Sequence, residues 1–435
     1  MCHTPRGVPL EAIHVPSMWP RWTLPGMRDH WLDEPHDSCR GGCAFLLHAM
    51  LDRYTGAPAG STRQTALDNA IVHMFEERLA FDFVLEDIHD HVEDPSNYDH
   101  YYRLRAAQQR VPVELQSFNK AMGQFYAGLG AEQRAAVGFL DPIGSELSGI
   151  AGKMRRLRKH AAHAKCGVHG ILDQADSVLE GEDTLESLTL LSAHLVGTLV
   201  DGAMHALPGL FSHALDGAHT GDMDVALPDH RTFPDTSEQF RREHPVTAIP
   251  PGSLDAAGTS FLPRLAKARW AFRLPIPMMS YINCVQVAMP NMPLLWTQLW
   301  RLKLAFWTRY VAIELANFFD LYADMRSAGL ICERLDAAVL SRQDEVRRLR
   351  DLAAHWRSPS RFSLALGEGI GYGDFLLVTG WAAEWARTNA NSRQDEIDRI
   401  PPLGSMVRRY AFAEAVNRAE RLRSRAMACG GAPGG

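Results

Sequence analysis

Apolar residues recur at intervals of three and four along most of the chain, the spacing that places them on one face of an α-helix. In the first half this pattern covers residues 44–54, 65–92, 113–128, 131–137, 147–179 and 185–207. In the second half it covers residues 296–326, 330–356, 375–388 and 405–428. Few windows alternate apolar and polar residues as strands do. The pattern therefore predicts an all-α protein built as a multi-helix bundle.

Changes in composition divide the chain into parts. Residues 1–36 are rich in Pro, Trp and His and predict an extended N-terminal arm. The helical pattern fills residues 37–216, which we expect to form a first helical domain. Gly, Pro, Asp, Ser and Thr crowd residues 217–262, as is typical of a linker. Residues 263–429 predict a second helical domain, and residues 430–435 a flexible tail.

The overall composition is that of an ordinary globular protein, with 46% hydrophobic and 22% charged residues. A net charge of −6 gives no electrostatic reason to expect a nucleic-acid partner. The seven cysteines are odd in number and contain no CxxC pair, which favours a reducing compartment over a disulfide framework. Because residues 1–25 also lack the apolar core of a secretory signal, we expect a cytoplasmic protein.

Residues 274–300 carry no charge and are numerous enough to span a bilayer. However, the segment contains four prolines and several amide and hydroxyl side chains, which make a poor lipid-facing helix. We therefore expect no membrane insertion, and interpret the segment as irregular chain buried between helices.

Nineteen histidines are a high number for 435 residues, and histidine is the commonest metal ligand. Glu86 and His89 lie three apart on one predicted helix, and Asp201 and His205 lie four apart on another. Both spacings place two side chains on one helix face, as in the Glu-x-x-His pairs of four-helix di-iron proteins. A non-haem di-iron oxygenase is therefore one interpretation, and a solvated acidic face is another. The carboxylates available to complete such a site are Glu76, Glu77 and Glu314.

Other motifs give weaker indications of a functional site. His163, Cys166 and His169 are spaced like zinc ligands along one helix, but no fourth ligand accompanies them. Residues 367–373 are rich in glycine but follow no predicted strand, so they predict a turn between helices and not a dinucleotide site. The sequence contains no GxSxG, P-loop or HExxH motif.

Several short segments carry a family resemblance. They are SCRGGCAFLL at residues 38–47, IHDHV at 88–92, YDHYYR at 98–103, LQS at 115–117 and LLSAHL at 190–195. In this order they resemble the distal-pocket helix, the substrate-binding stretch and the proximal-histidine helix of the indoleamine/tryptophan 2,3-dioxygenase superfamily. The resemblance covers residues 37–200. It implies an all-helical protein that binds haem b through one histidine.

The resemblance also implies a role for particular residues. His194 would be the proximal ligand of the haem iron, and Arg103 would hold the carboxylate of an amino-acid substrate, a task that suits a bidentate guanidinium. Tyr98 and Tyr102 would contact the aromatic ring of that substrate, although they suit a helix core equally well. The distal wall would include three further residues, namely Ala44, Leu47 and His48.

A second histidine competes with His194 for the axial position. The Gly-Thr-Gly-Gly loop that follows the proximal histidine in this family is missing near His194. A glycine-rich loop does begin twelve residues after His355, which makes His355 the rival ligand.

The sequence thus favours a haem-dependent oxygenase that takes O₂ and a small aromatic, tryptophan- or tyrosine-like substrate. The alternatives are a non-haem di-iron oxygenase and a helical scaffold or interaction protein without chemistry. A homo-oligomer is compatible with each of these functions.

Overall fold

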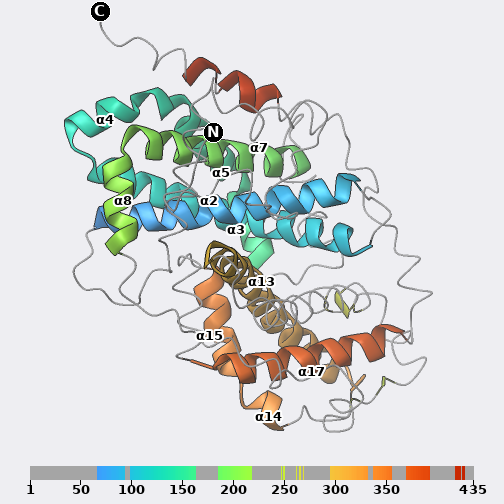
Figure 1. Ribbon diagram of the computed structural model, residues 1–435. Coiled ribbons are helices and arrows are strands. Elements are labelled where there is room, and N and C mark those ends of the chain that lie inside the picture. Colours follow the sequence, from blue (N-terminus) through green and yellow to red (C-terminus); the bar gives the residue numbers. More distant parts are fainter. Residues whose placement is uncertain are drawn as a thin grey trace, which may run out of the picture.

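The computed structural model describes residues 66–93, 98–162, 185–217, 294–331, 337–354, 369–391, 417–422 and 424–426, together with a few single positions between 246 and 268. All regular structure in these residues is helical, which confirms the all-α class. The helices form two groups, an upper and a lower one in Figure 1. Each group surrounds an apolar core of its own.

The first bundle is built on a pair of long helices, α2 (Ala66–Glu93) and α3 (Tyr98–Gly128), which run side by side in Figure 1. They pack against α5 (Asp141–Ala162) and α7 (Leu185–Ala206). Three short elements complete the bundle, namely α4 (Ala131–Val137), η3 (Gly138–Leu140) and α8 (Pro208–Gly217).

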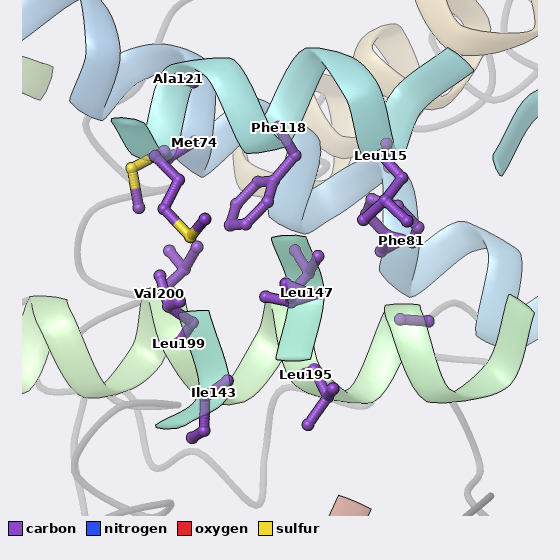
Figure 2. Close-up of a cluster of buried hydrophobic side chains, with 14 of the residues drawn as sticks. Met74, Phe81, Leu115, Phe118, Ala121, Ile143, Leu147, Leu195, Leu199 and Val200 are labelled. Carbon is purple, nitrogen blue, oxygen red and sulfur yellow. The ribbon is translucent and has the colours of Figure 1, made fainter. Parts of the chain in front are cut away.

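The core of this bundle forms where the apolar faces of these helices meet. Figure 2 shows Phe118 of α3 pointing toward Leu147 of α5, with Leu195 and Leu199 of α7 below them. Phe118, Leu147 and Leu195 are each 0% exposed. The helical spacing of apolar residues seen in the sequence therefore becomes a shared, dry interior.

The second bundle consists of α13 (Leu294–Ser327), α14 (Ala337–Leu340), α15 (Gln343–Ala354) and α17 (Tyr372–Asn391). Aromatic rings fill its core. Phe318 of α13 meets Trp381 and Trp385 of α17 edge to face, with ring centroids 6.0 and 5.3 Å apart. Because α13 also contacts α2, this helix joins the two bundles.

The observed helix limits follow the sequence closely in some places and depart from it in others. Residues 65–92, 131–137 and 185–207 were expected to be helical and correspond to α2, α4 and α7. Helix α3 begins fifteen residues before the expected start at residue 113 and continues through Pro112. A proline removes one backbone donor, and here the packing of both helical faces around it outweighs that loss.

The helix predicted over residues 330–356 is wrong in its extent. Gly329 adopts a left-handed φ of 75° and ends the preceding helix, where Leu330 N donates to Met325 O at 3.0 Å. Residues 341–342 then form a turn between α14 and α15. Apolar periodicity continues across these turns because both short helices pack on the same core.

Two segments pack in a different core from the one expected from their position in the sequence. Ile249, in the expected linker, is buried in the second core and donates its N–H to Asn389 Oδ1 at 2.6 Å. Ala419 and Ala426, in the expected second domain, are buried in the first core, and Arg418 forms an ion pair with Glu146 of α5. The C-terminal segment therefore returns to the first bundle.

One helix among the described residues, Ser187–Ala206 in α7, is long and apolar enough to cross a membrane by length and composition alone. In this protein 78% of it is buried inside the first bundle. A core helix of a globular protein passes the same test. Most of the uncharged segment at residues 274–300 lies outside the described residues.

Candidate functional site

A cluster of buried charged and polar side chains lies where α13 meets the α2–α3 pair. His73 and Glu77 are one turn apart on α2, and Glu114 and Ser117 are one turn apart on α3. Arg309 of α13 completes the group. Helical spacing of four and three residues directs each pair to one face, so the sequence itself aligns these side chains. We call these five residues the junction cluster.

The contacts within the junction cluster connect all three helices. His73 Nε2 lies 2.6 Å from Ser117 Oγ and 3.2 Å from Glu77 Oε1. Arg309 Nη1 lies 2.9 Å from Glu114 Oε2 and 3.7 Å from Glu77 Oε1. The shorter Arg309 contact is an ion pair whose N–H direction is not aligned for a hydrogen bond. One guanidinium thus faces two carboxyl groups from two different helices.

Burial dominates the electrostatics of the two carboxyl groups. Desolvation raises the pKa of Glu114 from 4.5 to about 8, against the opposing effect of Arg309. Desolvation also raises the pKa of Glu77 above its usual value. The hydrogen bond between the two carboxyls lowers the pKa of Glu77 and raises that of Glu114. Both pKa values therefore shift in the direction that favours the neutral carboxyl.

The geometry of the junction cluster limits the chemistry available to it. Ser117, His73 and Glu77 have the composition of a nucleophile triad. However, the serine and the carboxylate both contact the same ring nitrogen, whereas a triad uses the two nitrogens of the ring separately. Ser117 is also 0% exposed. The arrangement suits the storage of a proton and the joining of helices better than attack on a substrate.

Sequence reasoning found only part of this cluster. It treated Glu77 as an available carboxylate and residues 115–117 as part of a family motif, and it gave no role to Arg309. The signal that was present is a polar or ionisable residue at a few positions on the apolar face of a predicted helix, as for His73 and Glu77 on α2. No sequence pattern shows which such residues on separate helices meet.

His194, the expected axial ligand, lies on α7 and is partly exposed, while its Nε2 atom is buried. Arg103 lies near the start of α3, as do Tyr98 and Tyr102, and the side chains of these three are outside the described residues. The distal-wall residues and the rival ligand are also outside the described part of the chain, namely Ala44, Leu47, His48 and His355.

The helix register relates His194 to Arg103. Leu67 lies against Gly128 and His73 contacts Ser117, so α2 runs antiparallel to α3. Helix α8, which directly follows α7, lies at the start of α2 in Figure 1, and Arg78 of α2 contacts Asp201 of α7, so α7 also runs antiparallel to α2. Continuing both registers along α2 places the backbones of His194 and Arg103 within about two turns of each other, about 10 Å along the axis at 1.5 Å per residue. The two residues therefore flank the same part of α2.

The same register separates the residues of the di-iron interpretation. Asp201 lies at the level of Arg78, whereas Glu86 lies eight residues further along α2, about 12 Å away at 1.5 Å per residue. His205 is exposed and lies further from Glu86 and His89 still. The four residues are therefore not brought to one level, because their helices run in opposite directions.

The carboxylate of Asp201 is also bound by an arginine. Arg78 Nε and Nη2 donate to Asp201 Oδ1 and Oδ2 at 3.0 and 3.1 Å, a bidentate pair buried between α2 and α7. Among the described residues, no three His, Cys, Asp or Glu side chains group in a way that could hold a metal ion.

Comparison with known proteins adds no relative from which a function could be transferred. No family model, no curated protein and no solved structure matches the chain.

Proposed function

We propose that this chain is a haem-dependent oxygenase that acts on a small aromatic substrate with O₂. The proposal rests on the sequence resemblance and on one structural observation, the register of α7 and α3. The residues expected as axial ligand and as substrate anchor, His194 and Arg103, flank the same part of α2. A haem ligand and a substrate anchor must lie close together, because both act on one substrate pocket.

His194 suits a haem ligand in its chemistry and its surroundings. Its imidazole projects from a helix whose neighbouring residues Leu191, Leu195 and Val196 are buried and apolar. An apolar surrounding keeps water from the ligand side of a haem, and a neutral imidazole is the common proximal ligand. The bound haem would supply the oxidation chemistry. The protein would position the substrate, with Arg103 holding its carboxylate.

The absorption spectrum and the iron content of the purified full-length chain, reconstituted with haemin, test this proposal. We expect a Soret band and one iron per chain. His194→Ala should abolish the normal spectrum, because an alanine has no lone pair to donate to iron. The matched control is His205→Ala, an exposed histidine on the same helix, which should leave the spectrum unchanged.

Each other outcome overturns part of the proposal. A chain that stays colourless with haemin is not a haem protein. Loss of the spectrum in His355→Ala but not in His194→Ala moves the axial ligand to His355. Two irons per chain without a Soret band indicate the non-haem di-iron site.

A second candidate function is a helical scaffold or interaction protein without chemistry. One observation favours it. The junction cluster joins three helices and encloses its serine completely, as expected of a structural contact. A chain that binds neither haem nor iron, with a cooperative helical fold, would support this function.

A further inference from the structure

A short segment around Ile249 lies on the second bundle without forming a helix or a strand. The Ile249 side chain is 6% exposed and belongs to the second core. Val246 is half-buried against the same core, whereas Ala248 between them is exposed. The segment therefore inserts one apolar side chain into the bundle while its neighbour faces solvent, as a bound extended peptide does.

The sequence around this segment favours an extended backbone. Residues 245–251 read PVTAIPP. A residue that precedes proline avoids the helical region, so Pro250 restricts Ile249 to extended conformations. The three prolines carry no N–H, so this stretch has few backbone donors that need an acceptor. Because the segment is stiff before it docks, docking costs it little conformational freedom.

A buried asparagine of α17 contacts the backbone of the segment. Asn389 Oδ1 accepts a hydrogen bond from the N–H of Ile249 at 2.6 Å, and Asn389 Nδ2 donates to Trp385 O at 2.9 Å. Asn389 is 0% exposed. The bond to Trp385, one turn earlier on the same helix, orients the amide so that its oxygen faces the N–H of Ile249. The bundle thus binds one backbone group and one side chain of the same residue.

Few contacts attach the segment to the bundle. In the described part of the chain, no backbone–backbone hydrogen bond joins Val246, Ala248 or Ile249 to the rest of the protein. Further along the chain, Arg264 Nη1 donates to Asp324 Oδ2 of α13 at 2.8 Å, which keeps the segment near its site. A tethered ligand with few contacts exchanges with a free ligand of the same chemistry when the free one is concentrated enough.

We propose that the second bundle carries a docking site for an extended peptide, whose resident ligand is this chain's own residues 246–249. The site takes an apolar, β-branched side chain into the core and the N–H of the same residue onto Asn389. A partner protein with such a residue directly before a proline would displace the resident segment. This site does not involve His194 or Arg103, so it is independent of whether the chain binds haem.

Binding of a fluorescein-labelled peptide of residues 243–253 to the full-length chain, followed by fluorescence anisotropy, tests this proposal. The host is Ile249→Asp, because a carboxylate in an apolar core is costly and displaces the resident segment. We expect saturable binding to this host. Binding to the wild-type chain should be at least about tenfold weaker, because its own segment occupies the site at a high effective concentration. The peptide that carries Ile249→Asp should not bind.

N-methylation of Ile249 in the peptide tests the role of the asparagine. It removes the donor that Asn389 accepts and keeps the isoleucine side chain, so binding should weaken about tenfold, as expected when a buried acceptor loses its donor. In a host that also carries Asn389→Ala, the two peptides should bind equally, since residue 389 then accepts from neither. Asn119→Ala, on α3 of the first bundle, is the matched control and should keep the tenfold difference.

The results that overturn the proposal are distinct from failure to fold. Circular dichroism checks that the host is helical, and an unfolded Ile249→Asp host is replaced by Ile249→Ala, which weakens the resident segment but keeps a small apolar side chain. No saturable binding to a folded host overturns the proposal. So does equal binding of the two peptides to that host, or a difference between them that persists with Asn389→Ala.

Discussion

Arg78 and Arg309 are both buried arginines, yet their surroundings differ in a way that matters for stability. Arg78 is paired with the carboxylate of Asp201, which meets it with both oxygens at 3.0 and 3.1 Å. Arg309 instead faces two carboxyl groups at 2.9 and 3.7 Å. The first pair is balanced in charge and fork-like in geometry, which suits a permanent contact. The second is shared among more groups, because Arg110 Nε also lies 3.7 Å from Glu114 Oε1 and His73 Nε2 lies 3.2 Å from Glu77 Oε1.

Asp201→Asn should therefore destabilise the protein strongly. The substitution keeps the shape of the side chain but leaves the buried guanidinium of Arg78 without its counter-charge, which costs about 3–5 kcal/mol of the free energy of unfolding. Urea denaturation followed by circular dichroism measures this. Asp344→Asn is the control, because Asp344 forms an ion pair with Arg347 but is 97% exposed, and it should change little. A loss below 1 kcal/mol for Asp201→Asn would contradict the importance of the pair.

At the level of the helix, the sequence predicts best where one apolar face is continuous. Helices α2, α4 and α7 match their expected ranges within a residue or two. Helix α3 was predicted too short, because Pro112 and the charged residues before it suggest a boundary. The charges at Arg110 and Glu114 point into the junction cluster and not into solvent, so their polarity hid a buried face.

The candidate site was less predictable than the helices for the same reason. Helical spacing shows which residues share a face of one helix, but the partner of that face is a property of the assembled bundle. Arg309 contacts Glu114 across 195 positions of sequence, and no local pattern indicates that meeting. The same limit applied to Glu86 and Asp201, which share a motif type but lie at different levels of the bundle.

Phe118→Ala should show how much the packing of α3 stabilises the first bundle. Phe118 is 0% exposed and lies among side chains of α2, α5 and α7, so its removal leaves a cavity that rigid helices cannot close (Figure 2). Large-to-small changes of this kind cost about 3–5 kcal/mol. Leu340→Ala is the control, because Leu340 is 43% exposed and loses few contacts. Equal effects of the two substitutions in urea denaturation would contradict the packing shown here.

At the scale of the molecule, two apolar cores meet through charged and polar residues. The first core contains α2, α3, α5 and α7, and the second contains α13, α15 and α17. Apolar contact would join two bundles permanently, whereas a polar joint depends on the charge state of its members. The chain crosses this joint more than once, since residues 419 and 426 return to the first core. The two bundles therefore unfold together only as long as the joint holds.

Arg309→Met should uncouple the two cores. The substitution keeps most of the apolar stem but removes the cation that faces Glu77 and Glu114, so the joint loses about 3–5 kcal/mol, as expected when one partner of a buried ion pair is removed. Because each bundle retains its own core, we expect scanning calorimetry to resolve two transitions. The lower should shift by roughly 10 °C from the wild-type midpoint, at about 2–4 °C per kcal/mol.

Arg347→Met, on the solvent-facing side of α15, is the matched control and should keep the wild-type profile. A single transition in Arg309→Met, with equal calorimetric and van't Hoff enthalpies, would mean that the two cores are coupled by other contacts.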